Sequence, residues 1–463
     1  MGHKRVMLVV CMVAALNCAS VGYDSSMMSS LNILLSFQQK FRLDAQLKGL
    51  LTAVQNLGAI VAGLFSGLVV DRWGRKGGIL VASILVLISC AIHATSTTRA
   101  QFFVGRVLVG VAKAVDIAAV PTYLVEMAPP GRRGFVAGLY WTCWLVGAIL
   151  SAGVGYGARS IGGDWSWRTI CICMAGPAAS CIASLVLIPE SPRWLISRGR
   201  EQEGLKVLAK FHGNGDTDNP LVVAEFREIK ETIAMEKAEH AQSFRAWWKK
   251  FASEKSNRLR AYILLSLGVF EQTVGSSIIT YYLSNVLTLA GITSESQQFA
   301  INIGQNCVAL VAAIVGTCVI DRKRNGTKWN NSHGIPVPDR IFLDLDTLVF
   351  LLLRRGAQLY HPCKSMGFYS VITSSAGFFN QYVIPIGLTG IGWRFYIVGV
   401  CWNVFVAIVI AFTYIETKGL TLEQIAQRFE GVPRGEVLDV IEAYDGGKPI
   451  TELETCEKED RKQ

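Results

Sequence analysis

Residues 67–76 read GLVVDRWGRK, and they close an apolar run that begins near residue 50. Asp71 is followed by Arg72, Arg75 and Lys76, so a carboxylate and several cations crowd the end of an apolar helix. A carboxylate beside guanidinium groups accepts charge-assisted hydrogen bonds. The spacing therefore predicts a charged latch between helix ends, and a plain basic loop is the alternative.

A partial copy of this pattern lies in the second half of the chain. Residues 319–326 read VIDRKRNG, so Asp321 and Arg322 repeat Asp71 and Arg72. Internal repeats are how many transporters build two helical bundles around a site near the bilayer midplane. The copy predicts two related halves.

The composition is that of a membrane protein. The chain has 463 residues, of which 51% are hydrophobic and 17% charged, whereas soluble domains carry about 25% charged residues. A membrane helix needs roughly 20 mostly apolar residues. We therefore predict an all-α membrane protein with about ten spans, near 8–31, 50–70, 79–97, 102–127, 135–157, 169–189, 261–287, 299–320, 368–390 and 395–415.

The charges between these spans indicate orientation. Basic residues recur on alternate sides of the spans, as the positive-inside rule requires if both termini are cytoplasmic. The formal charge of +10 is thus attributed to orientation in the bilayer and not to a nucleic-acid partner. The 12 cysteines lie mostly in apolar runs, with no CxxC pair, so no metal or other cofactor is expected.

The predicted organisation follows from the spans and the polar stretches. It comprises an N-terminal six-helix bundle (1–189), a cytoplasmic helical linker (190–260), the start of a C-terminal bundle (261–320), an aberrant polar segment (321–367), two last helices (368–415) and a cytoplasmic tail (416–463).

Asp24 and Arg106 are ionisable residues inside predicted spans. Such residues are functional candidates because a charge in the membrane is costly. The positive charge of an arginine stabilises the ionised form of a neighbouring carboxylate. Protonation of Asp24 would remove that carboxylate charge and so release Arg106. The pair is predicted to act as a proton switch, and a purely structural ion pair is the alternative.

Several motifs together resemble the major facilitator superfamily, and within it the sugar porters. In order they are GYD (22–24), DRWGRK (71–76), GR (105–106), PTYLVEMAPPGRRG (121–134), PESPRWL (189–195), QTVGSSIITYY (272–282) and ETKG (416–419). The sequence resembles those of fungal lactose permeases and hexose transporters over about 1–320 and 368–430. The resemblance implies a two-bundle transporter of a mono- or disaccharide that works by alternating access, with proton coupling at Asp24 and Arg106. We expect a monomer in the plasma membrane.

The resemblance also implies a sugar site. Amides and hydroxyls suit a polyol because each can donate and accept, although ordinary polar packing between helices is the alternative. The expected substrate-binding residues are Gln272, Ser277, Tyr281, Tyr282 and Asn380. The chain departs from the family pattern at Glu271, Ser277 and Ala148, which leaves the identity of the sugar open.

Charged residues at predicted cytoplasmic helix ends are expected to form a gating network. Its members are Asp71, Arg75, Lys76, Glu126, Arg133, Glu190, Arg193, Asp321, Arg322, Glu416 and Lys418. Solvated pairs worth about 0–1 kcal/mol each are the alternative. Within the Arg106 span, Lys113 and Asp116 lie three residues apart and can pair on one helix face, or serve a second proton or substrate group.

After Arg322 the family pattern stops until Gly367. The intervening run LVFLLL (348–353) is too short to span a bilayer core about 30 Å thick. Helices nine and ten of the family therefore look absent, either through mis-splicing or wrong translation of the gene, or through a real truncation. The function predicted is proton-coupled sugar symport. A facilitator, a sugar sensor and an inactive shortened transporter remain alternatives, and no pattern favours an enzyme.

Overall fold

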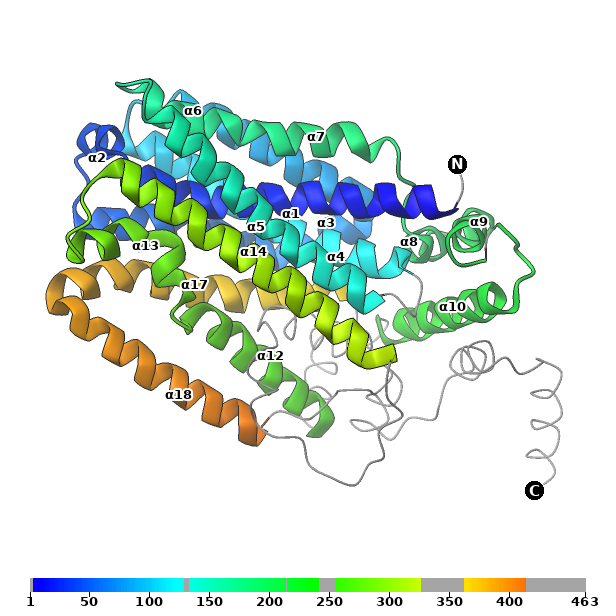
Figure 1. Ribbon diagram of the computed structural model, residues 1–463. Coiled ribbons are helices and arrows are strands. Elements are labelled where there is room, and N and C mark those ends of the chain that lie inside the picture. The colour runs from blue at the N-terminus through cyan, green and yellow to red at the C-terminus, as the bar shows by residue number, and fades with distance from the viewer. Residues whose placement is uncertain (1–2, 129–132, 214, 241–254, 326–361, 414–463) are drawn as a thin grey trace. The chain divides into compact units, whose positions relative to one another are not determined.

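The computed structural model describes residues 3–128, 133–213, 215–240, 255–325 and 362–413, and over these ranges it is built from helices (Figure 1). This confirms the all-α fold class. In chain order the elements are α1 (His3–Ile33), α2 (Leu35–Phe41), α3 (Ala45–Ala94), α4 (Arg99–Met127), α5 (Arg133–Ala158), α6 (Trp165–Cys173), α7 (Ala175–Leu185), α8 (Pro192–Ser197), α9 (Glu201–His212), α10 (Pro220–His240), α12 (Lys255–Thr273), α13 (Ser276–Leu289), α14 (Glu295–Asn325), α17 (Pro362–Ile391), the 3₁₀ turn η2 (Gly392–Arg394) and α18 (Phe395–Thr413).

Five apolar helical stretches among the described residues are long enough to cross a membrane. Two of them, Ala45–Ala94 and Gly367–Ile410, have 50 and 44 residues, about twice the roughly 20 that one crossing needs. The structure is thus a multi-pass membrane protein. The total of about ten spans stays a prediction, because residues 326–361 and 414–463 lie outside the described part.

The GLVVDRWGRK stretch makes a turn within α3. Gly74 has φ 85° and ψ 172°, a backbone conformation that residues with a Cβ rarely adopt. The chain folds back at this glycine and brings residues 70 and 78 together: a Cβ added at Gly78 would lie 3.0 Å from Cγ2 of Val70. This single glycine separates the two predicted spans 50–70 and 79–97.

Local capping fixes where two long helices begin. The side chain of Asp44 accepts a hydrogen bond from the backbone of Leu47 at the start of α3. Thr98 does the same for Gln101 at the start of α4. Each cap satisfies one of the backbone N–H groups that a helix leaves unpaired at its first turn. Polar residues at these two positions thus set the helix starts.

An aromatic cluster fixes the short helix α2 against α4 and α6. Phe37, Phe41, Phe102 and Trp167 are buried, and their ring centroids lie 5.1–5.9 Å apart. Such tilted and edge-on contacts add about 0.5–1.5 kcal/mol per pair beyond the burial itself. This cluster closes the end of the bundle at which α1 ends and α3 begins.

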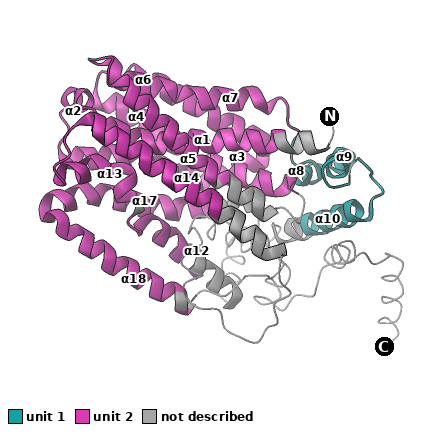
Figure 2. Cartoon of the chain, in the orientation of Figure 1, with its two compact units in different colours: residues 1–7, 190–259, 416–463 teal, residues 8–189, 260–415 magenta. Residues whose placement is uncertain are grey.

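The chain forms two compact units (Figure 2). One contains residues 8–189 and 260–415, and the other residues 1–7, 190–259 and 416–463. In the smaller unit α8, α9 and α10 share an apolar core of Ile196, Leu208, Ala209, Val222 and Ile233. His212 of α9 also contacts the Glu225 carboxylate of α10. The domain boundaries expected from the sequence stay predictions.

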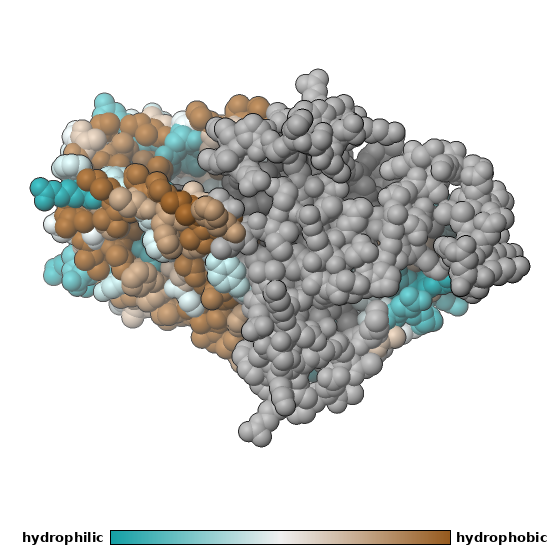
Figure 3. All heavy atoms as spheres, turned by 90° about the horizontal axis from the view of Figure 1, so that it is seen from below, coloured by the Kyte–Doolittle hydropathy of each residue, from teal (hydrophilic) through white to brown (hydrophobic). Residues whose placement is uncertain are grey.

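The larger unit presents apolar side chains on its outside. Figure 3 shows brown, apolar residues over most of the described part of one face, with polar residues at its tip. On α18 the exposed side chains include Val400, Phe405 and Phe412. Exposed apolar area this extensive marks a surface that contacts lipid or another apolar partner. With the helix lengths above, it indicates lipid.

Candidate functional site

The predicted pair of Asp24 and Arg106 lies inside the N-terminal helices. Nη1 of Arg106 on α4 donates to Oδ1 of Asp24 on α1 at 2.6 Å, and the two side chains are 0% and 8% exposed. The structure thus brings together the two residues that the sequence singled out. A buried pair of this kind loses several kcal/mol when one partner is removed, because the other charge is left unpaired.

Gln55 of α3 is a third member of this site that the sequence analysis missed. Its Oε1 accepts a hydrogen bond from Nη2 of Arg106, so Arg106 is held by two helices at once. An amide in an apolar run carries no charge and is common in membrane helices, which is why it did not stand out. The adjacent amides of Gln55 and Asn56 inside a strongly apolar span were the available signal.

Glycines let α3 and α4 approach closely enough for this contact. A Cβ at Gly110 of α4 would lie 1.7 Å from the backbone oxygen of Gln55. One at Gly58 of α3 would lie 2.0 Å from the backbone oxygen of Val107. Small residues at such positions are typical of closely packed membrane helices. The two glycines therefore set the distance between Gln55 and Arg106.

The predicted span 261–287 is not one continuous helix, because it is divided between α12 and α13. Gln272 lies near the end of α12, whereas Ser277, Tyr281 and Tyr282 lie on α13. The break falls at Val274 and Gly275. Glycine is a poor helix former, and a helix end leaves backbone carbonyls unpaired. Tyr282 also departs from helical geometry, with φ −124° and ψ 26°.

This break supplies hydrogen-bond acceptors to the predicted sugar site. The backbone oxygen of Gln272 accepts from Nδ2 of Asn380 on α17, and the hydroxyl of Ser277 lies 3.4 Å from the same oxygen. The hydroxyl of Tyr282 donates to the backbone oxygen of Gln381, also on α17, at 2.5 Å. Four of the five predicted residues, Gln272, Ser277, Tyr282 and Asn380, therefore meet where α12, α13 and α17 come together. Tyr281 is buried next to Tyr282.

Gln381 joins this cluster to the N-terminal helices, and it too was missed. Its Oε1 accepts from Nδ2 of Asn56 on α3 at 2.9 Å. Nδ2 of Asn32 on α1 likewise donates to the backbone oxygen of Tyr281 at 3.3 Å. These buried bonds link residues more than two hundred positions apart, so no local sequence pattern could have assigned them. These bonds place the predicted sugar site next to α1 and α3.

Glu271 occupies a position where the family pattern favours glutamine. Its Oε2 accepts a hydrogen bond from the hydroxyl of Tyr369 on α17. Glu271 also interacts electrostatically with Lys113 of α4. A carboxyl group and an ammonium from the two halves of the chain are thus within electrostatic reach of each other.

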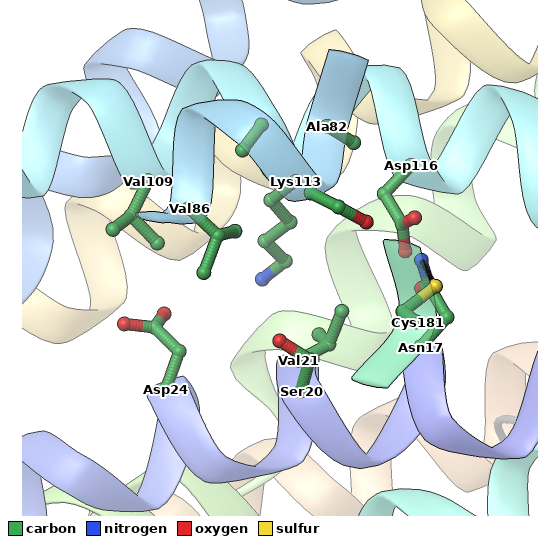
Figure 4. A pocket seen from close by; sticks show the side chains of 12 residues that line it. Asn17, Ser20, Val21, Asp24, Ala82, Val86, Val109, Lys113, Asp116 and Cys181 are labelled. Atoms are coloured by element: carbon green, nitrogen blue, oxygen red, sulfur yellow. Dashed lines mark hydrogen bonds between the residues drawn. The ribbon is translucent and has the colours of Figure 1, made fainter. Parts of the chain in front are cut away.

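The expected pairing of Lys113 with Asp116 is not made. Both carboxylate oxygens of Asp116 are buried and accept no hydrogen bond from any residue in the described ranges. Positions three apart on a helix are close enough to pair, but the Lys113 side chain extends toward Asp24 instead (Figure 4). Both side chains line one cavity in the N-terminal helices, together with Asn17, Asp24 and Cys181.

The charged network is partly placed by the structure. Arg75 binds Glu126 through two hydrogen bonds of 3.0 and 2.9 Å, and its Nη1 lies 3.8 Å from Asp71. Nζ of Lys76 donates to the backbone oxygen of Ile188 at 3.1 Å. These contacts tie the α3 turn to the end of α4 and to the segment after α7.

The other predicted network residues are placed less fully. Glu190 and Arg193 lie at and just inside the start of α8, where Oε1 of Glu190 accepts from the backbone of Ser191 at 2.9 Å. Arg133 opens α5, and Asp321 and Arg322 lie near the end of α14. Glu416 and Lys418 lie outside the described residues.

Comparison with known proteins decides the family. The family model described as "Sugar (and other) transporter" matches residues 10–323, which is more than half of the chain. The chain belongs to the sugar transporter family of the major facilitator superfamily. The match ends just after Arg322, close to where the family pattern stops. The absence of helices nine and ten stays a prediction.

The similarity to known transporters extends over most of both chains. "MFS glucose transporter mfs1" of Aspergillus flavus is 26% identical over 493 residues, which cover 93% of this chain and 91% of the relative. "Probable metabolite transport protein CsbC" of Bacillus subtilis is 28% identical over 441 residues, covering 87% and 90%. These relatives agree with the expectation that the chain is not an enzyme.

Solved structures show the same fold. The proton:xylose symporter XylE bound to 6-bromo-6-deoxy-D-glucose superimposes with a TM-score of 0.67 at 20% identity, covering 92% of this chain and 100% of that one. A partially occluded inward open form of the xylose transporter XylE from E. coli gives a TM-score of 0.65 at 19% identity. The fold is therefore that of a major facilitator transporter.

Proposed function

We propose that this sugar porter is a proton-coupled sugar symporter, with Asp24 as the proton acceptor. The observation that carries the proposal is the buried contact between Asp24 and Arg106. A proton on Asp24 removes one charge of the pair and weakens its hold on Arg106. Among the described residues, Gln55 then remains as the hydrogen-bond partner of Arg106, so the link from α4 to α1 weakens while the link from α4 to α3 stays.

The sugar is proposed to bind where α12, α13 and α17 meet α1 and α3. Gln272, Ser277, Tyr281, Tyr282 and Asn380 offer amide, hydroxyl and aromatic groups there. Such groups can donate to and accept from sugar hydroxyls, and rings can cover the apolar face of a pyranose. Glucose transporters and a xylose symporter are among the proteins similar to this chain, which supports a monosaccharide.

Alternating access needs contacts that open and close on the two sides of the site. On one side Arg75 binds Glu126 beside the α3 turn. On the other, the backbone N–H of Leu35 donates to Oε1 of Glu295 at 2.8 Å, and Asn32 bonds to the backbone of Tyr281. We propose that these two groups of contacts are the cytoplasmic and outer gates of a monomer in the plasma membrane, with both termini cytoplasmic.

Uptake and exchange of labelled sugar by vesicles containing the full chain test this function. A symporter accumulates sugar when a proton gradient is imposed, and a protonophore abolishes the accumulation. Asp24→Asn should lose accumulation but keep sugar exchange, because exchange needs no net proton movement. Ser26→Ala, at a buried position of the same helix outside the cavity that Lys113 and Asp116 line, is the matched control and should keep both.

Each alternative gives a different result in this experiment. A facilitator would take up sugar in a manner indifferent to the protonophore and to Asp24→Asn. A sensor would bind sugar without uptake. A chain that takes up no more sugar than empty vesicles, and binds none, would be an inactive transporter.

A further inference from the structure

A water-sized cavity lies inside the N-terminal helices, beside the Asp24–Arg106 contact but distinct from the sugar cluster (Figure 4). Residues of α1, α3, α4 and α7 line it, among them Asn17, Asp24, Lys113, Asp116 and Cys181. Its volume is about 30 Å³. Since one water needs roughly 10–15 Å³ on this measure, about two water molecules fit.

Asp116 is the unexplained group in this cavity. Its side chain is 3% exposed, and neither carboxylate oxygen accepts a hydrogen bond from a residue in the part of the chain that the structure covers. The Asn17 amide approaches this carboxyl group, and it also donates to Sγ of Cys181 at 3.8 Å. An ionised carboxylate buried without donors is costly by several kcal/mol, whereas the protonated acid is not.

Within the described ranges, the groups that face Asp116 do not include a cation in contact with it. Cys18 of α1, Tyr140 of α5 and Cys181 of α7 lie within electrostatic reach, and each is neutral in its ordinary protonated form. From α3 the cavity receives Ser83, which does not titrate. Among the described residues that line the cavity, Lys113 on the same helix brings the positive charge and Asp24 brings a negative one.

Lys113 lies between two carboxyl groups and pairs with neither. Its ammonium group points into the cavity, toward the side on which Asp24 lies (Figure 4). Asp24 is already bound by Arg106. Lys113 also interacts electrostatically with Glu271 of α12. A flexible ammonium in this position can approach whichever carboxyl group is ionised.

Among the described residues, the charges around this cavity and Glu271 do not balance when all of the groups are ionised. Asp24, Asp116 and Glu271 are carboxyl groups, whereas Arg106 and Lys113 are the cations near them. One carboxyl group therefore exceeds the cations, and a single bound proton restores neutrality. Asp24 accepts from the Arg106 guanidinium and Glu271 accepts from the Tyr369 hydroxyl, whereas no cation among the described residues contacts Asp116. Asp116 is therefore the carboxyl group that holds this proton while Asp24 is paired with Arg106.

We propose that Asp116 is a second proton-binding site, joined to Asp24 through Lys113 and the water of the cavity. In the transfer, the O–H bond of Asp116 breaks as its proton passes to a cavity water. That water releases a proton to Oδ of Asp24, and Lys113 moves to the new carboxylate of Asp116. No bond to carbon changes and no redox partner is needed. The proposal deepens the proton-coupled function and shares its proton acceptor.

Infrared difference spectroscopy of the reconstituted full chain tests this site directly. Spectra are recorded from about pH 9 to about pH 5, where buried carboxyl groups titrate. Subtracting the spectra of Asp116→Asn from those of the wild type should leave a protonated-carboxyl C=O band that disappears as the pH rises. Ser83→Ala, which changes the same cavity without removing a carboxyl group, should keep the band.

A second variant tests the link to Asp24. In Asp24→Asn a negative charge near the cavity is gone and Arg106 is released. The remaining band of Asp116 should then lose its proton with a midpoint at lower pH. Asp116→Glu, which keeps the acid, should shift the band without abolishing it and guards against a folding defect.

Two results would overturn the proposal: identical spectra for the wild type and Asp116→Asn at every pH, or a band that does not change with pH. The uptake experiment is independent of these spectra. A titrating Asp116 in a protein whose uptake ignores the protonophore would uphold the site and reject symport. Proton-driven uptake with a silent Asp116 would reject the site and uphold symport.

Discussion

Arg75 and Glu126 bind each other through two parallel hydrogen bonds, although fifty residues separate them in the sequence. Nε and Nη2 of Arg75 lie 3.0 and 2.9 Å from the two carboxylate oxygens of Glu126, and the side chains are 6% and 8% exposed. A forked contact of this kind is stronger and more specific than a single ion pair. It fixes the turn of α3 against the end of α4.

Removing Glu126 should therefore be costly. We expect Glu126→Ala to lower the free energy of unfolding by about 3 kcal/mol, because the buried Arg75 guanidinium loses both of its hydrogen bonds to the Glu126 carboxylate. Arg75→Gln combined with Glu126→Gln should cost less than the sum of the single changes. Thermal unfolding in detergent measures both.

Asp71 supplies the matched control for this contact. Its side chain is 43% exposed and lies 3.8 Å from Arg75, so the pair is screened by solvent. Asp71→Asn should change stability by less than about 1 kcal/mol. Equal losses for Asp71→Asn and Glu126→Ala would contradict the assignment of Glu126 as the principal partner.

Close packing at Gly110 should be necessary for the Asp24–Arg106–Gln55 site. A Cβ there would lie 1.7 Å from the backbone oxygen of Gln55, so α3 and α4 must separate to accept it. We expect Gly110→Ala to cost about 1–3 kcal/mol and to reduce uptake at least tenfold. Thermal unfolding and uptake are measured on the same preparation.

Gly153 on α5 is the control, because a Cβ added there meets no atom within 4 Å. Gly153→Ala should be neutral or stabilising by up to about 1 kcal/mol, since alanine reduces the freedom of the unfolded chain. A similar loss in both variants would show that the defect comes from glycine replacement in general.

The contact of Leu35 with Glu295 should restrain the outer gate. Glu295→Ala removes the acceptor, and we expect it to favour opening by about 1 kcal/mol, which corresponds to about fivefold. A cysteine reporter at the buried position Ser29 of α1 should then be labelled about fivefold faster by a thiol reagent.

Glu295→Gln keeps an oxygen acceptor and should leave the labelling rate close to that of the parent. The same protein without the reporter gives the background from the native cysteines. Equal rates in Glu295→Ala and the parent would exclude this contact as a gate.

Stability near pH 4 should depend slightly on Lys40. The hydrogen bond from Lys40, at 2.7 Å, lowers the pKa of Asp164 in the loop before α6. A lowered pKa in the folded state means that the contribution is present above the unfolded value of about 3.9 and is lost as the pH falls through the folded pKa. Both side chains are more than a third exposed, so the pair is worth less than about 1 kcal/mol.

Lys40→Met should accordingly lower the unfolding temperature a little at neutral pH, and the difference from the wild type should vanish in acid. Unfolding temperatures measured in a pH series provide the check. A difference that persists unchanged below the folded pKa would show that Lys40 acts by packing and not by its charge.

The interruption between Arg322 and Gly367 leads to a prediction about the transcript. The loss and return of the family pattern are abrupt, so we expect the mature message to encode two further apolar helices in this interval. Sequencing the transcript across codons 315–370 decides this. A message that matches the present chain would establish a real truncation, and the uptake experiment would then test a shortened transporter.

The sequence by itself determined the membrane class, the helical fold and the family. Long apolar runs cannot be placed in water, and backbone groups in lipid must pair within helices, so composition alone restricts the architecture. Asp24 and Arg106 were found because charges inside apolar runs are costly and stand out. The apolar runs on either side of the GLVVDRWGRK stretch, 50–70 and 79–97, were likewise visible.

Only the tertiary structure decided which residues meet. Glu126 binds Arg75, which is distant in the chain, and no spacing rule gives that partner. Gln55, Asn56 and Gln381 are neutral amides whose roles depend on which helix packs beside them. Lys113 and Asp116 share a helix face, yet the Lys113 side chain extends toward Asp24 across the cavity. Local propensity acts over a few residues, whereas these contacts depend on how closely helices pack, which the glycines at 58 and 110 set for α3 and α4.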